Sequence, residues 1–354
     1  MDVFDVAVIG AGVVGVATAR HLALSGARVV LVERGADILS GASKANSAIL
    51  HTGFDAPEGS LELACMQAGH ADYLALRQAM NLPLLETGAL VVAWTPAQEA
   101  ELPAILSTAH RNGVGDCRLV DAAEIARREP HLAPARAAVL VPREHVIDPW
   151  SPFHAYALQI LAAGSTILRG TEVTGGRFDG TWWLQTLRGP LQARTVVNAA
   201  GLHGDRIEAL LLGQSHFTIK PRKGQFAVFD KAAARLLTHI ILPVPEPRTK
   251  GVVLCRTAFG NVLIGPTAEE TPERDRPTVT TGALQALIGR EAEILPALRD
   301  MPITATYAGL RPASEEKHYR ILHDPARNWL TLGGIRSTGL TASLGIALLI
   351  STQN

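Results

Sequence analysis

The chain has 354 residues, which exceeds the size at which one hydrophobic core usually stops growing, so we expect two domains or one large domain with an insertion. Hydrophobic residues make up 47% of the chain and charged residues 19%, a composition that excludes a disordered or fibrous protein. The 33 basic and 33 acidic residues balance, so no overall charge attracts nucleic acid or an anionic membrane, and a bound anion needs a local site.

The cysteines and histidines indicate neither a disulfide framework nor a metal site. Cys65, Cys117 and Cys255 lie far apart and form no CxxC pair, which fits a reducing, cytoplasmic environment. The twelve histidines form no HxxxH or HExxH motif, so no metal ligand set is expected. No stretch reaches the roughly 18 apolar residues that indicate a transmembrane helix.

The first predicted element is a buried strand over residues 3–9, because this run is rich in β-branched residues. The apolar run does not resemble a signal peptide. Asp2 and Asp5 stand where a signal peptide carries positive charge, and glycines interrupt the run.

Gly10, Gly12 and Gly15 form a GxGxxG motif between this strand and an apolar helix over about 14–24. Gly10 allows the tight turn, Gly12 lets the backbone approach a pyrophosphate, and Gly15 lets helix and strand pack closely. A second strand, 27–32, ends at Glu33, 18 residues after Gly15, where an acid can accept hydrogen bonds from ribose hydroxyls. A glycine-rich turn without ligand is the alternative. The strand, the glycines, the helix and the acid together indicate a site for ADP-ribose or ADP-ribityl. Such a site does not distinguish NAD from FAD.

Further along the chain, apolar periodicity predicts helices at 61–80, 96–112, 151–163 and 281–294. Short strands are expected at 88–94, 224–229, 252–256 and 261–267. Residues 171–197 read as hairpin strands with turns at Gly175-Gly176 and Asp179-Gly180, and Trp182 and Trp183 are expected to be packing residues. The Pro-rich segment 241–251 is expected to be a surface loop or lid.

The last predicted elements are a strand that ends at Gly333 and Gly334 and a helix that follows Thr338. Hydroxyl residues and glycines before the helical run provide N-cap chemistry and free N–H groups. The chain therefore ends, like its start, in a strand, a glycine turn and a helix.

Four further segments carry motifs: SGASKANSAILHTGFD (40–55), TVVNAAGLHGDRI (195–207), YAGLRPAS (307–314) and LTLGGIRSTGLTAS (330–343). They resemble segments of the D-amino-acid oxidase-like superfamily of FAD-dependent oxidoreductases. In chain order they resemble its flavin-contacting loop and helix, its second dinucleotide-contacting strand, its GxRP segment and its C-terminal flavin motif. The branch of glycerol-3-phosphate and L-2-hydroxyglutarate dehydrogenases is the most similar, because a KxNSxxxHxG-type stretch lies beside its flavin ring. The resemblance covers residues 3 to about 350 and implies FAD.

The resemblance implies an α/β fold with a Rossmann-like FAD-binding domain and a smaller α+β substrate domain that contains a mixed or antiparallel sheet. Because the fingerprint and the last flavin motif lie at opposite ends of the chain, the FAD domain must be discontinuous. We place it at 1–80, 146–214 and 304–354, and the substrate domain at 81–145 and 215–303.

The same resemblance predicts which residues contact FAD. The expected positions are Gly10, Gly12, Val14, Gly15, Glu33, Arg34, Ser43, Lys44, Asn46, Ser47, Val173, Ala200, Gly201, Gly309, Gly334, Arg336, Gly339, Leu340 and Thr341.

His51 and Arg311 are the candidate catalytic residues, and both are expected to contact substrate. His51 lies in the flavin-side stretch, and the ordinary pKa of histidine suits proton removal at neutral pH. A structural hydrogen bond or covalent attachment of the flavin are the alternatives for His51. Arg311 belongs to the GxRP segment, whose arginine faces the substrate pocket in the family, and its planar fork matches a carboxylate or phosphate. A surface ion pair with Glu315 or Glu316 is the alternative for Arg311.

Two more basic residues are expected to bind substrate. Arg336, within GGIRSTG, could reach a flavin carbonyl or a second substrate anion; some relatives carry an acid near here. Lys223 belongs to KPRKGQ, which resembles the family's entry into the substrate domain. Weaker pocket candidates are Lys44, Arg222, His239 and Arg256.

The predicted activity is an FAD-dependent dehydrogenase that oxidises the CH–OH of a small anionic substrate, a 2-hydroxy acid such as L-2-hydroxyglutarate or glycerol 3-phosphate, by hydride transfer to flavin N5. The alternatives are an amino-acid or amine oxidase with a CH–NH donor, and a flavoprotein subunit of a larger dehydrogenase complex. Oxygen, a quinone and a protein remain open as electron acceptors. A quinone would imply peripheral association with the inner membrane.

Overall fold

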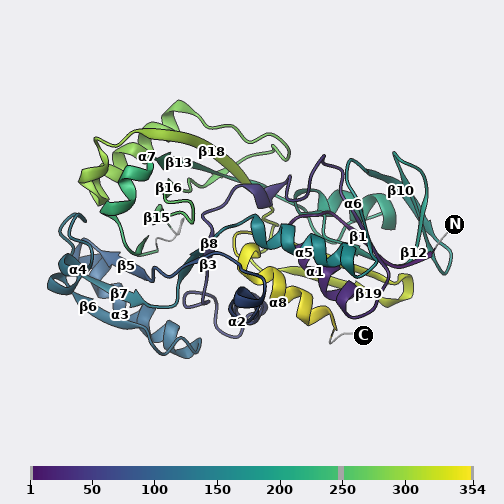
Figure 1. The fold of residues 1–354 in the computed structure, drawn as a ribbon, viewed down its shortest axis with the longest axis horizontal. Coiled ribbons are helices and arrows are strands. Elements are labelled where there is room, and N and C mark those ends of the chain that lie inside the picture. The colour runs from purple at the N-terminus through teal and green to yellow at the C-terminus, as the bar shows by residue number, and fades with distance from the viewer. Residues whose placement is uncertain (1–2, 246–250, 352–354) are drawn as a thin grey trace.

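The computed structural model describes residues 3–245 and 251–351. Two sheet-centred lobes lie side by side, with the helix α2 and a small sheet between them (Figure 1). The first lobe contains both described ends of the chain, so residues far apart in sequence meet there.

The first lobe is built on a sheet whose central strands are all parallel, in the order β9, β2, β1, β12 and β20. Antiparallel strands extend it, β19 beyond β20 and the β10–β11 hairpin beside the start of β12. The strands are β1 (Val3–Ile9), β2 (Val29–Val32), β9 (Thr166–Leu168), β10 (Val173–Phe178), β11 (Trp182–Thr186), β12 (Leu191–Asn198), β19 (Arg320–Asp324) and β20 (Trp329–Gly333). The carboxyl ends of the parallel strands therefore share one edge, where open α/β sheets bind ligands.

Helices cover both faces of this sheet, so its central strands β1 and β2 are largely apolar and buried. They are α1 (Val13–Leu24), α2 (Leu61–Ala79), α5 (Ser151–Ala162), α6 (Gly204–Leu212) and α8 (Gly339–Ser351). Glycines let α2 and α8 cross closely, because a Cβ on Gly69 would lie 1.9 Å from the Thr341 carbonyl and one on Gly345 would lie 2.1 Å from the Cys65 carbonyl. The C-terminal helix is thus fixed against the N-terminal part of the chain.

The second lobe is a nine-stranded, mainly antiparallel sheet in the order β17-β13-β16-β15-β14-β5-β7-β6, with β18 on β13. Its strands are β5 (Ala89–Ala93), β6 (Arg118–Asp121), β7 (Ala137–Val141), β13 (Arg222–Phe229), β14 (Ile240–Pro243), β15 (Val253–Arg256), β16 (Val262–Gly265), β17 (Glu269–Glu270) and β18 (Ile303–Arg311). Its helices are α3 (Pro96–Arg111), α4 (Ala122–Arg128) and α7 (Thr281–Ile294). The observed architecture confirms the expected α/β class; the residue boundaries of the two domains stay a prediction.

A three-stranded sheet joins the lobes. Its strands are β3 (Ile49–Leu50), β8 (His145–Ile147) and β4 (Leu84–Leu85). β3 and β8 pair antiparallel, with Leu50 opposite His145. This register brings together the residue after β3, His51, and the residue before β8, Glu144.

Most predicted elements lie within one or two residues of their expected positions, but two local predictions are wrong. Gly175 and Gly176 do not form a turn; they lie inside β10, where the register shifts. A Cβ on Gly176 would lie 2.9 Å from Leu211, so glycine there serves packing against α6. The segment predicted as a loop from residue 241 begins inside β14, and residues 246–250 lie outside the described residues.

The two tryptophans differ in environment. Trp182 is fully buried and its indole donates to the Arg327 carbonyl, so it packs in the core as expected. Trp183 is half-buried, donates to Asp179 and lies under the Arg177 guanidinium.

Candidate active site

A cavity of about 1340 Å³ lies between the two large sheets. Its walls come from the carboxyl ends of β1, β2, β12 and β20 and from β13 and β18 of the second sheet. A small-molecule pocket usually measures about 300–1,000 Å³. The larger volume here suits a dinucleotide together with a second ligand.

The glycine turn between β1 and α1 forms one end of the cavity. Gly10 has φ +102°, and a Cβ on it would lie 2.6 Å from the Ala199 carbonyl. A Cβ on Gly15 would lie 1.8 Å from the Gly10 carbonyl, so only glycine permits this packing. The Val13 amide at the start of α1 donates to the Ser43 hydroxyl at 3.0 Å. Amide groups and a hydroxyl therefore converge where a pyrophosphate would bind a helix N-terminus.

The Glu33 carboxylate lies at the end of β2 and also lines the cavity. Its two oxygens accept hydrogen bonds from the Ala11 amide at 2.8 Å and from the Gly35 amide at 2.7 Å. These bonds hold the carboxylate beside the glycine turn, at the distance along the chain expected for a ribose-binding acid. The glycine cradle and the carboxylate together fit an ADP moiety.

A segment of the second lobe closes over this end of the cavity. Arg274 donates to both Asp205 oxygens, at 2.6 and 2.9 Å, and to the Leu202 carbonyl at 2.8 Å. Asp275 bonds Arg34 and His203. Burial alone would raise the pKa of Asp205, but the Arg274 side chain and backbone amides outweigh it and hold that pKa below its usual value. The segment is thus held by charged hydrogen bonds to the first lobe.

The turn between β20 and α8 forms the opposite wall. Gly334 has φ +65°, and a Cβ on it would lie 2.8 Å from Arg320. The Thr338 hydroxyl bonds the Tyr319 hydroxyl at 2.6 Å and donates to Glu62 at 2.9 Å. These buried bonds fix the start of α8, whose first residues, Gly339 and Leu340, line the cavity. Amides at this helix start can stabilise negative charge on a bound flavin.

His51 lines the cavity and is held at both its backbone and its ring. Its amide donates to the Thr341 hydroxyl at 3.0 Å, and its Nδ1 lies 2.8 Å from a Glu144 oxygen. Glu144 is fully buried, and its other oxygen accepts from the Thr52 amide at 2.5 Å and the Thr52 hydroxyl at 2.8 Å. The His51 side chain keeps 27% of its exposure, so the ring can reach a ligand.

Three arginines, Arg222, Arg311 and Arg336, line the same cavity. A Cβ on Gly224 would lie 2.8 Å from Arg311 Nη2, so that glycine provides the room the guanidinium occupies. Burial, followed by the nearby Arg222 and Arg336 charges, lowers the pKa of Arg311 to about 10.

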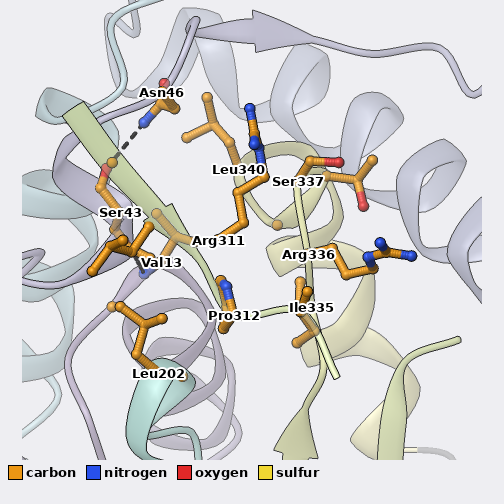
Figure 2. Close-up of a pocket in the computed structure, with 18 of the residues that line it drawn as sticks. Val13, Ser43, Asn46, Leu202, Arg311, Pro312, Ile335, Arg336, Ser337 and Leu340 are labelled. Atoms are coloured by element: carbon orange, nitrogen blue, oxygen red, sulfur yellow. Dashed lines mark hydrogen bonds between the residues drawn. The ribbon is translucent and has the colours of Figure 1, made fainter. Parts of the chain in front are cut away.

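Within the described residues, no carboxylate forms an ion pair with these arginines. The Arg311 guanidinium donates two long hydrogen bonds, both of 3.4 Å, to the Thr267 carbonyl. Figure 2 shows Arg311 between the segment that carries Ser43 and Asn46 and the one that carries Ser337 and Leu340. Desolvated cations without a fixed counterion make this part of the cavity suitable for an anion.

The alternative for Arg311, an ion pair with Glu315 or Glu316, is wrong. Both carboxylates instead approach Arg320, which does not line the cavity.

Most of the expected site residues line the cavity, and three do not. Gly15 packs against the Gly10 carbonyl, and Thr341 is buried and bonds the His51 amide and the Ile49 carbonyl. The ammonium of Lys223 lies 3.2 Å from Glu269. Because side chains alternate along β13, Arg222 and Gly224 face the cavity instead of Lys223. Of these two neighbouring basic residues, Arg222 and not Lys223 therefore lines the cavity.

The weaker candidates divide in the same way. Lys44 and Arg222 line the cavity, whereas His239 and Arg256 do not. His239 Nδ1 lies 2.7 Å from the buried Glu129.

Three contributors were missed from the sequence: Glu144, Glu62 and Arg274. Each acts through a residue that is distant in sequence; His51 and Glu144, for example, are 93 positions apart. A single sequence carries no signal for such pairs.

Among the described residues, no helix combines the length and the apolar character needed to cross a membrane. The same residues contain no group of three or more His, Cys, Asp or Glu side chains that could hold a metal ion.

Residues 5–353 match the family model described as DAO, FAD dependent oxidoreductase. A glycerol 3-phosphate dehydrogenase of Caloramator mitchellensis is 30% identical over 353 residues, which cover 98% of this chain and 73% of that protein. The solved structure of dithionite-reduced L-alpha-glycerophosphate oxidase from Mycoplasma pneumoniae with FAD bound has a TM-score of 0.90 at 26% identity. The match covers 98% of this chain and 94% of the oxidase chain. The crystal structure of glycine oxidase from Geobacillus kaustophilus has a TM-score of 0.89 at 25% identity, and the match covers 99% of this chain and 94% of that chain.

Proposed function

Because the chain belongs to the DAO family of FAD-dependent oxidoreductases, we propose that it oxidises the secondary alcohol of glycerol 3-phosphate. The observation that carries this proposal is the set of three cavity arginines without a carboxylate partner among the described residues. A phosphate dianion can accept several hydrogen bonds from guanidinium groups at once. The glycerol 3-phosphate dehydrogenase and oxidase similar to this chain support the choice of a phosphate ester.

The protein is an FAD-dependent enzyme, and its own residues fit that cofactor. The glycine turn and Ser43 would hold the pyrophosphate, and Glu33 would accept from the ribose of the ADP half. The amides of 339–340 would face the ring system. Bound FAD supplies the two-electron acceptor for the carbon–hydrogen bond that breaks.

The residues of the chain perform the remaining tasks. Arg311 and Arg222 hold the phosphate, with Arg336 contributing positive charge. His51 takes the proton of the hydroxyl as the carbon is oxidised to a ketone, a role that needs a neutral ring nitrogen directed to the substrate. The buried surroundings exclude water and strengthen both interactions.

The test is anaerobic addition of substrates to the yellow protein. Glycerol 3-phosphate should bleach the flavin absorbance, whereas glycerol, which lacks the phosphate, should bleach it far more slowly. L-2-hydroxyglutarate tests the 2-hydroxy acid alternative, and glycine tests the CH–NH alternative, which the likeness to glycine oxidase favours. Bleaching by either of these and not by glycerol 3-phosphate would overturn the proposal.

Reoxidation of the bleached protein then identifies the acceptor by comparing oxygen with a soluble quinone. Slow reoxidation by both would point to a protein acceptor, and hence to a flavoprotein subunit of a larger complex.

We also propose a cytoplasmic location, which the three buried free cysteines support, since such thiols persist in a reducing compartment.

A further inference from the structure

We propose that Glu144 is a positioning residue of the reaction: it holds His51 in the tautomer that carries its lone pair on Nε2, the nitrogen that would take the substrate proton. The inference rests on the proposed function, because it assumes that His51 is the base. Glu144 itself does not line the cavity.

The backbone places the two residues together. β3 and β8 pair antiparallel with Ile49 opposite Val146 and Leu50 opposite His145. The next position along β3 is His51, and the preceding position along β8 is Glu144. The pair is therefore set by strand register and does not depend on a long, flexible side-chain approach.

The hydrogen bonds assign the proton on the ring. As a carboxylate, Glu144 can only accept hydrogen bonds. Its Oε1 accepts two from Thr52, and its Oε2 lies 2.8 Å from His51 Nδ1. Nδ1 must then carry the hydrogen, and in a neutral imidazole the lone pair falls on Nε2. The His51 amide bond to Thr341 restrains the same residue from its backbone side.

The surroundings make the arrangement rigid. Glu144 has no exposed surface, and the Thr87 hydroxyl bonds its backbone carbonyl. A fully buried carboxylate that takes part in three hydrogen bonds has one low-energy orientation, because any rotation leaves a polar atom without a bond. When His51 takes the substrate proton, the same carboxylate stabilises the imidazolium that results.

The chain contains a matched pair remote from the cavity. Glu129 is 1% exposed, and its Oε1 lies 2.7 Å from His239 Nδ1 while also accepting from the His239 amide. Neither residue lines the cavity. A substitution in this pair therefore reports the structural effect of breaking a buried Glu–His hydrogen bond, without any direct effect on catalysis.

The decisive variant is Glu144→Gln in the full-length, FAD-loaded protein. The two donors of Thr52 require an oxygen, so the amide oxygen stays on Thr52 and the NH₂ group faces His51 Nδ1. The ring must then accept at Nδ1 and carry its hydrogen on Nε2, which removes the base. We expect the rate of flavin reduction at saturating glycerol 3-phosphate to fall about 100-fold, the lower end of general-base effects. The substrate concentration for half-maximal rate should change by less than about threefold, since no phosphate contact is lost.

The control is Glu129→Gln, which should leave the reduction rate at the wild-type value even if its melting temperature falls. A second variant, Glu144→Asp, keeps an acceptor and should retain more activity than Glu144→Gln. Equal losses in Glu144→Gln and Glu129→Gln would indicate a general structural effect and overturn the inference.

A spectroscopic readout does not depend on activity. Long-range ¹H–¹⁵N spectra of ¹⁵N-histidine-labelled protein distinguish the two tautomers, and His51→Asn assigns the His51 signal by its loss. The wild-type signal should be that of the Nδ1–H tautomer, and in Glu144→Gln it should change to the Nε2–H tautomer. A wild-type signal of the Nε2–H tautomer overturns the inference even if no variant folds. Absence of flavin reduction by glycerol 3-phosphate in the wild type would instead contradict the proposed function and leave the tautomer result readable.

Discussion

Arg222 and Arg311 lie directly opposite each other on the antiparallel strands β13 and β18. Like charges in facing positions destabilise a sheet, and burial increases the cost. Their persistence in the wall of the cavity is explained if an anion between them supplies the missing negative charge. The register of two strands thus brings two positive charges together in the wall of the cavity.

Arg311→Met should weaken substrate binding without lowering the stability of the free protein. Loss of a buried, charge-assisted contact to a phosphate costs about 2–4 kcal/mol, which corresponds to a KM increase of roughly 30- to 1,000-fold. The melting temperature should not fall, because the variant removes a repulsion with Arg222. Steady-state kinetics and thermal unfolding measure the two effects.

Inorganic phosphate gives an independent check on this site, since a ligand that binds only the folded state raises the melting temperature. Phosphate should stabilise the wild type and Lys223→Met, whose side chain pairs with Glu269 outside the cavity, but not Arg311→Met. Equal stabilisation of all three proteins would contradict the anion site.

Arg274→Met should loosen the segment that closes the ADP end of the cavity. It removes the bonds to both Asp205 oxygens and to two backbone carbonyls. The buried Asp205 carboxylate then lacks its charged partner, so the free energy of unfolding should fall by about 1–3 kcal/mol. FAD should also dissociate faster, which release of flavin fluorescence on dilution measures. Arg290→Met is the control, because it removes an exposed pair with Glu293 worth at most about 1 kcal/mol.

Gly309→Ala should disturb the loop that carries the flavin-side residues. The new Cβ would lie 2.5 Å from the Ala45 carbonyl, a backbone atom that can move only with its loop, and overpacking of this kind costs roughly 1–3 kcal/mol. The purified variant should contain less FAD per chain and melt at a lower temperature. At Gly289, inside α7, nothing lies within 4 Å of a new Cβ, so Gly289→Ala should keep full FAD content.

The tyrosines and cysteines should titrate only when the protein unfolds. Burial raises the pKa of all four tyrosines, Tyr73, Tyr156, Tyr307 and Tyr319. Burial also raises the pKa of Cys65 to about 11 and those of Cys117 and Cys255 to about 12, from an ordinary 9.0. Between the ordinary thiol pKa and these raised values, the folded protein binds more protons than the unfolded chain. The free energy of unfolding should therefore fall as pH rises above about 9.

Ultraviolet titration and thiol labelling test this. Phenolate absorbance should rise together with loss of structure, and a thiol reagent at pH 8 should label none of the three cysteines until denaturant is added. Phenolate formation near pH 10 in protein that keeps its circular dichroism would contradict the prediction.

The ends of the fold could be predicted from sequence because their chemistry is local. Gly10 has a positive φ of +102°, Gly15 packs against the Gly10 carbonyl within the same turn, and Glu33 directly follows the next strand. The same holds for the helices with clear apolar periodicity, such as α3, whose Thr95 cap and Gln98 form a capping box.

The central parts of the site depend on pairings that a single sequence does not encode. Lys223 and Arg222 are adjacent and equally basic, and only the side of β13 that faces the cavity distinguishes them. Glu144 is an ordinary acid in sequence and becomes the partner of His51 only through the register of β3 and β8. Gly176 resembles a turn glycine, but α6 determines its place.

The position of α8 against α1 and α2 has a consequence for how the protein is made. Because Gly10 and Leu340 line the same cavity, the flavin cannot be enclosed until nearly all of this sequence has left the ribosome. The first strand and helix must wait, with apolar surface exposed, through synthesis of the second lobe, a situation that favours chaperone binding. A nascent chain stalled before residue 330 should therefore be colourless and protease-sensitive, while release of the remaining residues should convert it to a yellow, resistant form.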